Sequence, residues 1–205
     1  MIDRPRREIW LFRHGETAWS LTGQHTGRTD LPLNNIGRRQ GEALGRALAN
    51  RSFAIVLCSL LIRAVETCRL AGYGETARYT DDLKEWDYGA YEGLRQVEIL
   101  EKRPGWTIWK DGAPGGETVV QVAERARRAI VLADASDGDV AVFSHGHMVR
   151  SLAASWLGLP GDAGRYFDLA TGSTSVIGYH SAERVIRTCN HTIIFPAHMT
   201  DEKAA

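Results

Sequence analysis

Residues 8–15 read EIWLFRHG, an apolar run that stops abruptly at Arg13 and His14. A short apolar run that ends at a polar, glycine-containing turn is typical of a buried strand entering a tight loop. Two further apolar runs, at 54–58 and 139–143, end at polar turns in the same way. We therefore predict three buried strands, each followed directly by a polar loop.

Helical patterns lie between and after these strands. Asn34 is suited to cap a helix, and Thr118 and Gln121 have the spacing of a capping box before a long helix. The pattern predicts helices over about 35–50, from 59 to about 71, from 118 to about 135 and over about 148–157, with late strands at 174–179 and 185–189. Strands that alternate with helices predict an α/β fold, a three-layer sandwich around a mostly parallel central sheet.

Reactive side chains follow each of the three buried strands. The residues concerned, in chain order, are Arg13, His14, Ser59, Arg63 and His145. In parallel α/β sheets, ligands bind at the carboxyl ends of the strands. The sequence therefore predicts one rim at which arginine and histidine side chains from distant segments meet.

The segment at about 88–116 differs from its surroundings. It is polar, contains a short helical stretch at 95–103, and carries Trp106 and Trp109 before a pair of glycines. We expect a lid-like excursion over the rim, within a single domain that spans residues 1–205. The alternative is a surface excursion whose two tryptophans close the core, since aromatic side chains pack more often than they bind.

The bulk properties exclude several classes of protein. The 205 residues suit one domain with a sizeable core, and 25 basic and 25 acidic side chains give a formal net charge of zero. Such a balance does not favour a nucleic acid or an anionic membrane as partner. Attraction for an anionic substrate must therefore come from a local cluster of charge.

Three features of the sequence indicate a location. Three cysteines without regular spacing argue against a disulfide framework, and the stretch at 1–7 is polar rather than signal-like. The sequence has no apolar run of about 18 residues, the length that a spanning helix needs. We expect a cytoplasmic protein and leave the formation of a homo-oligomer open.

The predicted rim suits a phosphoryl group, which is a compact dianion. Guanidinium groups bind such oxygens in pairs, which makes Arg13 and Arg63 candidates for the anion site. His14 is the candidate nucleophile, because a neutral imidazole nitrogen can accept a phosphoryl group covalently. Gly15 would let backbone N–H groups approach the phosphate closely.

Two further residues complete the reaction. His145 can donate to a non-bridging oxygen and stabilise the transition state, and Glu85 is the candidate acid that protonates the leaving alkoxide. Each residue alone also has a structural interpretation, as a turn, a surface charge or a satisfied core histidine. The shared strand-end position favours the functional interpretation for the set.

Two hypotheses from other classes stand beside this one. The sequence His145-Gly146-His147 can ligate zinc, with Glu85 or Asp87 completing the shell, although two nearby arginines would repel a divalent cation. A non-catalytic module that binds a phosphorylated ligand would need only the arginines. We therefore expect an enzyme that uses neither a metal nor a cofactor.

Five blocks of this sequence resemble the histidine phosphatase, or phosphoglycerate-mutase-like, superfamily. They occur in the family's order and are highly specific in combination. The blocks are LFRHGETAW at 11–19, TGRTDLPL at 26–33, SLLIRA at 59–64, the acid block at 83–93, and SHG at 144–146 with Arg150.

The resemblance implies a phosphoglycerate-mutase-like fold and a metal-independent phosphatase with His14 as nucleophile. Arg13, Arg63 and His145 would form the phosphate pocket, and Glu85 would donate the proton. The resemblance is strongest to a subgroup of sedoheptulose-bisphosphatase-like and acid-phosphatase-like enzymes. The expected substrate is a small phosphorylated metabolite such as a sugar phosphate, and the alternative activity is that of a phosphoglycerate mutase.

A wall for the leaving group is predicted beside this pocket, at Gln24, His25, Thr26, Gly27 and His147. Two positions depart from the family's pattern. Leu60 stands where a proline is usual, which puts the local turn geometry in question. His147 stands where many members have a small residue, and we expect it to touch substrate, orient Glu85 or simply pack.

Overall fold

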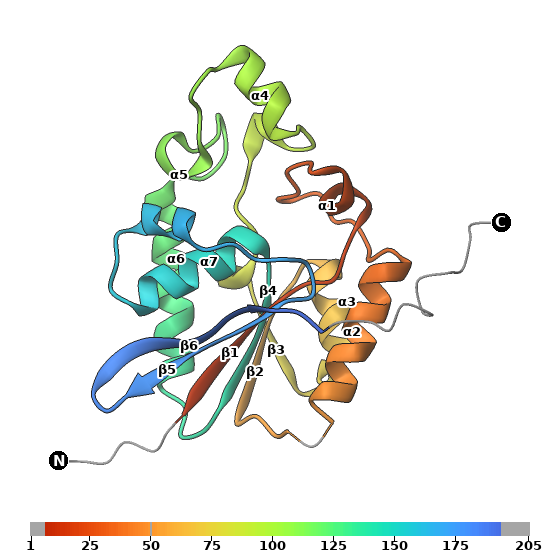
Figure 1. Cartoon of the computed structure of the whole chain (residues 1–205), viewed down its shortest axis with the longest axis vertical. Helices are drawn as coiled ribbons and strands as arrows, with labels where there is room; N and C mark the ends of the chain where they lie inside the picture. Colours follow the sequence, from red (N-terminus) through yellow and green to blue (C-terminus); the bar gives the residue numbers. More distant parts are fainter. Residues whose placement is uncertain (1–6, 50, 194–205) are drawn as a thin grey trace.

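The computed structural model describes residues 7–49 and 51–193, and Figure 1 shows how their helices and strands are arranged. Most of the polar stretch that begins the chain lies outside the described residues, as does Asn50 at the expected end of a helix. Within the described ranges, no helix combines the length and the apolar character that crossing a lipid bilayer requires.

Six strands of the described chain form one sheet in the order β3-β2-β4-β1-β5-β6. They are Glu8–Arg13 (β1), Ile55–Ser59 (β2), Ala77–Thr80 (β3), Val140–Ser144 (β4), Thr174–His180 (β5) and Glu183–His191 (β6). The pairs β1–β4, β2–β4 and β2–β3 are parallel, whereas β5 is antiparallel to both β1 and β6. The prediction of a mostly parallel central sheet is confirmed.

Helices cover both faces of this sheet (Figure 1). α2 (Asn35–Ala47) and α3 (Ile62–Leu70) lie on one side, and α6 (Val119–Asp134) and α7 (Gly146–Trp156) lie on the other. Within each layer the two helices contact each other. The α/β fold with three layers is therefore confirmed.

Alternate side chains of the buried strands enter two separate cores, because successive residues of a strand point to opposite faces. On β4, Val140 and Val142 join the larger core, which includes residues of α6 and α7. Ala141 and Phe143 join the smaller core, which includes residues of α2 and α3. A strand buried on both faces reads as a continuous apolar run, which explains why these strands are legible in the sequence.

Both predicted helix caps are present. The side chain of Asn34 accepts a hydrogen bond from the Gly37 N–H at 2.8 Å, and Thr118 and Gln121 form the predicted capping box. α2 ends at Ala47, earlier than predicted, and a short turn follows it. The other three predicted helix ends lie within one residue of the observed ends, at Leu70, Asp134 and Trp156.

Several elements differ more from the prediction. α3 begins at Ile62 rather than near 59, and α1 (Ala18–Thr22) has no predicted counterpart. α7 begins at Gly146 rather than near 148, so His145 is its N-cap residue. The glycine weakens the local helical pattern and hides this start. β3 has no predicted counterpart, because it is a short edge strand of which Tyr79 is 47% exposed, and it carries no continuous apolar run.

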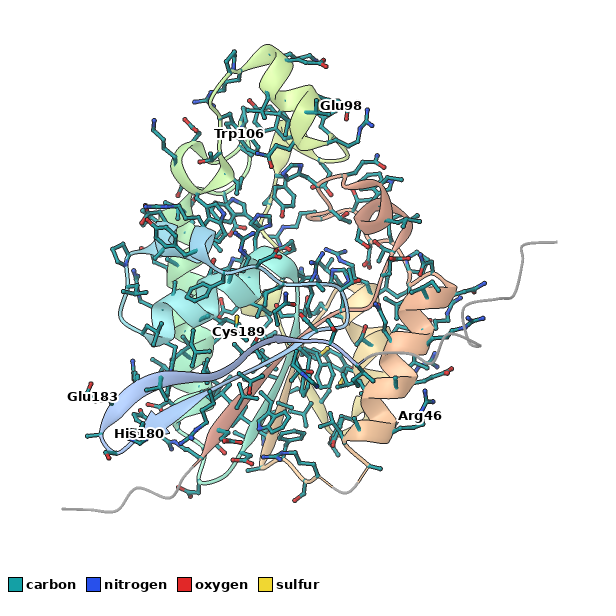
Figure 2. The ribbon with its side chains drawn as sticks, in the orientation of Figure 1. Arg46, Glu98, Trp106, His180, Glu183 and Cys189 are labelled. Atoms are coloured by element: carbon teal, nitrogen blue, oxygen red, sulfur yellow. The ribbon has the colours of Figure 1, made fainter. Side chains whose placement is uncertain are left out.

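The 88–116 excursion stands above the sheet in Figure 1 and contains a 3-10 turn at Gly89–Tyr91, α4 (Gln96–Lys102) and α5 (Ile108–Asp111). Trp106 and Trp109 are 2% and 6% exposed and belong to the larger core. Figure 2 labels Trp106 among the side chains of this segment. Both tryptophans therefore pack in the core, as the alternative interpretation expects of them, and the role of the excursion as a lid stays a prediction.

Candidate active site

The predicted strand ends lie side by side, because β4 lies between β1 and β2 in the sheet. Arg13 is in register with Ser144, and the His14 N–H donates to the Ser144 carbonyl at 3.0 Å. The Arg13 N–H donates to the Ser173 carbonyl, and the Gly172 N–H donates to the His14 carbonyl. Main-chain bonds to two segments therefore hold the backbone of His14.

The hydrogen bonds of His14 assign its tautomer. Nδ1 lies 2.7 Å from the carbonyl oxygen of Gly15, and because a carbonyl can only accept, Nδ1 carries the proton. Nε2 then has a free lone pair. Burial, followed by the charges of Arg63 and Arg13, holds the pKa of His14 well below its usual range. A buried and uncharged Nε2 has the character of a nucleophile.

Gly15 is required by the close approach of its loop to the first turn of α2. Its N–H donates to Thr67 Oγ1 at 3.0 Å, and a Cβ at this position would lie 2.3 Å from the carbonyl oxygen of Gly37. Since side-chain carbons do not approach backbone oxygens so closely, any larger residue would displace the loop that carries His14. The contact explains the glycine by packing, and its predicted role in bringing backbone N–H groups close to a phosphate stays a prediction.

Three buried nitrogen atoms around His14 lack a hydrogen-bond partner in the described part of the chain: Arg13 Nε, Arg63 Nε and His145 Nδ1. Buried polar groups are nearly always paired, so such atoms mark a place where a ligand supplies the partner. The ring centres of His14 and His145 are 5.2 Å apart. Burial, and then the charges of both arginines, lower the pKa of both histidines. The arrangement therefore suits an anion.

Arg63 and His145 are fully buried behind this site. The terminal nitrogens of Arg63 donate, at 2.9–3.1 Å, to the carbonyl oxygens of Thr26, Gly27 and Thr29. His145 Nε2 lies 2.7 Å from Ser59 Oγ. These bonds fix both side chains and leave one nitrogen of each without a partner among the described residues.

The carboxylate of Glu85 is held at the N-terminus of α7. Oε1 accepts the N–H groups of Trp86 at 2.9 Å and Met148 at 3.0 Å, whereas Oε2 accepts only the His147 N–H, at 3.0 Å, among the described bonds. A carboxylate has about four lone-pair positions, so Oε2 keeps one open. A Cβ on Gly146 would lie 3.7 Å from this oxygen, and the glycine keeps the approach to it clear.

A cavity of about 270 Å³ brings most of the predicted site together. Three of the predicted catalytic residues line it: Arg13, His14 and Glu85. Four of the predicted wall residues line it as well: Gln24, His25, Thr26 and His147. The sequence thus places seven side chains from four separate segments on one cavity.

Gly27, Arg63 and His145 are not among the described residues that line this cavity. Gly27 lies behind the wall, and its predicted role in binding substrate stays a prediction. Its N–H donates to Glu92 Oε1 at 2.8 Å, and a Cβ would lie 2.5 Å from the Trp86 carbonyl oxygen, so it is packed inside the wall. Arg63 and His145 lie deeper, beside His14 rather than at the opening.

Tyr88 connects the two histidines of the wall. Its ring lies against His25 with centres 4.8 Å apart, and its hydroxyl lies 2.7 Å from His147 Nδ1. His25 Nδ1 donates to the Leu94 carbonyl at 2.8 Å. Burial lowers the pKa of His147 well below its usual range and raises the pKa of Tyr88 well above its own. The neutral side chains of His147 and Tyr88 suit hydroxyl groups of a ligand.

Sequence reasoning missed several residues of the cavity wall, among them Ser20, Tyr88, Gln96, Asp168 and Leu169. Tyr88 adjoins the acid block and could have been found from that neighbourhood. Ser20, Gln96 and Asp168 carry no local signal, because each reaches the cavity only through the fold of its segment. Arg150, which the resemblance includes, also lines the cavity.

The described ranges contain no set of side chains that could bind the zinc ion of the alternative hypothesis. No group of three or more His, Cys, Asp or Glu side chains there is placed to hold a metal ion. His145 and His147 each direct a ring nitrogen to a hydroxyl, of Ser59 and Tyr88 respectively. The two histidines of the His-x-His motif therefore bind different neighbours and do not point to a shared metal site.

Comparison with known families agrees with this geometry. The family model of the histidine phosphatase superfamily, branch 1, matches residues 9–192. The chain belongs to the histidine phosphatase superfamily. The match includes every predicted catalytic residue of this superfamily member.

Individual relatives cover most of the chain. An acid phosphatase of Mycobacterium tuberculosis is 42% identical over 180 residues, which cover 86% of this chain and 88% of that protein. A sedoheptulose 1,7-bisphosphatase of Saccharomyces cerevisiae is 36% identical over 181 residues, which cover 73% and 67%. The solved structure of an open reading frame from Mycobacterium tuberculosis has a TM-score of 0.86 at 40% identity, covering 91% of this chain and 98% of that chain.

Proposed function

We propose that this protein hydrolyses phosphomonoesters of small metabolites through a phosphohistidine on His14, without a metal ion. The observation that carries the proposal is the free Nε2 of a buried, neutral His14 among unpaired nitrogens of Arg13, Arg63 and His145. A nucleophile and an anion site coincide there. The relatives named as an acid phosphatase and a bisphosphatase support the same reaction class.

In the first step, the lone pair of His14 Nε2 forms a bond to phosphorus while the bond from phosphorus to the leaving oxygen breaks. Arg13, Arg63 and His145 hold the non-bridging oxygens and stabilise their developing charge. The proton on Glu85 Oε2, the oxygen with an open lone-pair position, passes to the leaving oxygen. A neutral alcohol departs.

In the second step, water attacks the phosphorus of the phosphohistidine. The carboxylate of Glu85 accepts a proton from this water, and the nitrogen–phosphorus bond breaks. The bonding electrons return to His14 Nε2, and inorganic phosphate leaves. Glu85 thus acts as acid and then as base, and both residues regain their starting forms.

The leaving group faces the wall formed by Gln24, His25, Thr26 and His147. These side chains are polar, and a cavity of about 270 Å³ suits a small sugar phosphate or a molecule of similar size. We propose such a phosphorylated metabolite as substrate. The excursion at 88–116, which contributes Tyr88 and Gln96 to the wall, would act as a lid within a single domain.

The decisive experiment is a screen of phosphorylated metabolites with released phosphate as the readout, in the presence of EDTA. We expect phosphate release that EDTA does not reduce, and rapid quenching should trap an acid-labile label on His14. Interconversion of 2- and 3-phosphoglycerate, with bisphosphoglycerate present, should be slower than hydrolysis. Label on another residue, zinc-dependent activity or faster interconversion would contradict the proposal.

Two further proposals concern the cellular location and the oligomeric state of the protein. We place it in the cytoplasm, in keeping with three free cysteines among the described residues, two of them buried. We leave formation of a homo-oligomer as a prediction for size measurement in solution.

A further inference from the structure

Arg125 is a buried residue of α6 that the proposed reaction does not use. Its side chain has five N–H donors, and all five are bonded. Two of them form a fork to Glu117, with Nε and Nη2 each 2.7 Å from a carboxylate oxygen. The other three donate to main-chain carbonyl oxygens of Asp82, Lys84 and Glu85, at 3.0, 2.8 and 3.3 Å.

Glu117 binds the residues that follow Glu85 in the chain. Its Oε2 accepts the Asp87 N–H at 2.9 Å, and its carbonyl oxygen accepts Trp86 Nε1 at 2.8 Å. Its own N–H donates to the Asp87 carbonyl at 2.9 Å. Together, Arg125 and Glu117 bind the main chain before, at and after Glu85.

These bonds matter because the segment that carries Glu85 has no other regular support. Residues 84–88 belong to no helix or strand, so neither a helical nor a sheet bond pattern fixes their backbone. The Glu85 carboxylate is meanwhile anchored to the N-terminus of α7. Arg125 therefore links α6 to the backbone of Glu85, and α7 binds the side chain of the same residue.

We propose that Arg125 and Glu117 form a clamp that positions Glu85 for proton transfer to the leaving group; this rests on the proposed role of Glu85 as the acid. The clamp does not touch substrate in the described cavity, which neither residue lines. Displacement of a catalytic group by about 1 Å can cost about 100-fold in rate. Loss of the clamp should therefore slow the steps that need the proton.

Lysine cannot replace Arg125 in this arrangement. Its ammonium group has three donors at one point, whereas the guanidinium presents five in a plane. Arg128 offers a matched control on the same helix, because it binds the Asp82 carboxylate in the same segment, with bonds of 2.7–3.2 Å. It makes no described bond to the backbone of Glu85, and its side chain is 58% exposed.

The test compares Arg125→Lys with Arg128→Lys in single-turnover formation of the phosphohistidine. The substrates are glycerol 2-phosphate, whose alkoxide needs a proton, and p-nitrophenyl phosphate, whose leaving group needs it far less. Arg125→Lys should slow the alkyl substrate by about 10-fold or more and change the nitrophenyl substrate by less than about threefold. Arg128→Lys should leave both rates unchanged.

A merely structural role would give other results. Equal slowing of both substrates by Arg125→Lys, or an equal effect of Arg128→Lys, would overturn the clamp. Glu117→Gln keeps the size of its side chain and serves as the second variant if Arg125→Lys does not fold, with the same selective slowing expected.

Glu85→Gln separates failure of the clamp from failure of the proposed function. If Glu85→Gln slows the alkyl substrate selectively and Arg125→Lys does not, only the clamp is wrong. If Glu85→Gln slows both substrates equally, the acid role of Glu85 is wrong, and the clamp is wrong with it.

Discussion

Two sets of residues share the candidate site, and the fold holds them in different ways. The phosphate set follows buried strands and comprises Arg13, His14, Arg63 and His145. The leaving-group wall comes mostly from loops and comprises Gln24, His25, Thr26, Tyr88 and His147. Sheet register and main-chain bonds fix Arg13 and His14 of the first set. In the second set, the side chains of Gln24 and His25 are held by the loop carbonyls of Gly93 and Leu94.

This difference suggests that the phosphate set determines the reaction and that the wall determines which substrate is accepted. A rigid scaffold gives the reacting groups one geometry, and loops on that scaffold tolerate changes of sequence and length. The phosphate set should therefore respond to mutation by losing rate with every substrate. The wall should respond by changing the preference among substrates.

The largest expected effect comes from His14→Ala, which tests the phosphate set directly. Hydrolysis should fall by about 10⁴-fold or more with every substrate, because no nucleophile then remains at the anion site. The measurement is steady-state phosphate release, with the melting temperature as a check on folding. His180→Ala is the control, since His180 is exposed at the end of β5, in the hairpin that Figure 2 labels. Full activity of His14→Ala would end the proposed mechanism.

Glu85→Gln should have the next largest effect, and it depends on the leaving group. The amide keeps the shape of the acid but cannot transfer a proton, so alkyl phosphates should react about 100-fold more slowly or worse. Phosphohistidine formation from p-nitrophenyl phosphate should change much less. Single-turnover rates give the comparison, and Glu98→Gln on the exposed part of α4 is the control. Equal slowing would assign the acid role to another residue.

A smaller and more selective effect is expected from His25→Ala. His25 lines the cavity and is held by the Leu94 carbonyl, so its loss removes one polar contact to the leaving group. For a sugar phosphate, kcat/KM should fall by about 10-fold, the value of one hydrogen bond of about 1 kcal/mol or slightly more. The rate of phosphohistidine hydrolysis should stay the same. If both rates fell together, the wall and the phosphate set would not be separable.

The last expected effect is on stability rather than on rate, and it involves both sets. Burial lowers the pKa of His14, His145 and His147 well below about 6.5, the value in an unfolded chain. Below pH 6.5 the unfolded chain binds protons that the folded protein does not, so the free energy of unfolding should fall as the pH is lowered. Each histidine contributes up to about 1.4 kcal/mol per pH unit.

His147→Gln tests this prediction, because it removes one of the three buried titrating groups. Between pH 6.5 and 5, its free energy of unfolding in urea should fall less steeply than that of the wild type, by up to about one proton. His180→Ala, at an exposed position, should retain the wild-type slope. An unchanged slope in His147→Gln would show that His147 titrates alike in both states.

The phosphate set could be predicted from the sequence because its signals are local. Arg13 and His14 directly follow an apolar run, and His145 follows another, so their strand-end position is visible without the fold. The packing of Gly27 against Trp86 and Glu92 could not be predicted, because both partners lie about 60 positions away in the sequence. The tryptophans of the excursion illustrate the same limit, because amphipathic rings suit both a core and a binding site.

By itself, the sequence determined the α/β class, the parallel strands and the position of the candidate reacting groups at the strand ends. Strands buried on both faces require continuous apolar residues, and this requirement is written locally in the chain. Only the tertiary structure decided that Arg125, one of 25 basic residues, would hold the backbone of Glu85 from 40 positions away. That contact exists because α6 docks beside the segment at 82–87. No local pattern distinguishes an arginine that will meet three main-chain carbonyl groups from one that will meet solvent.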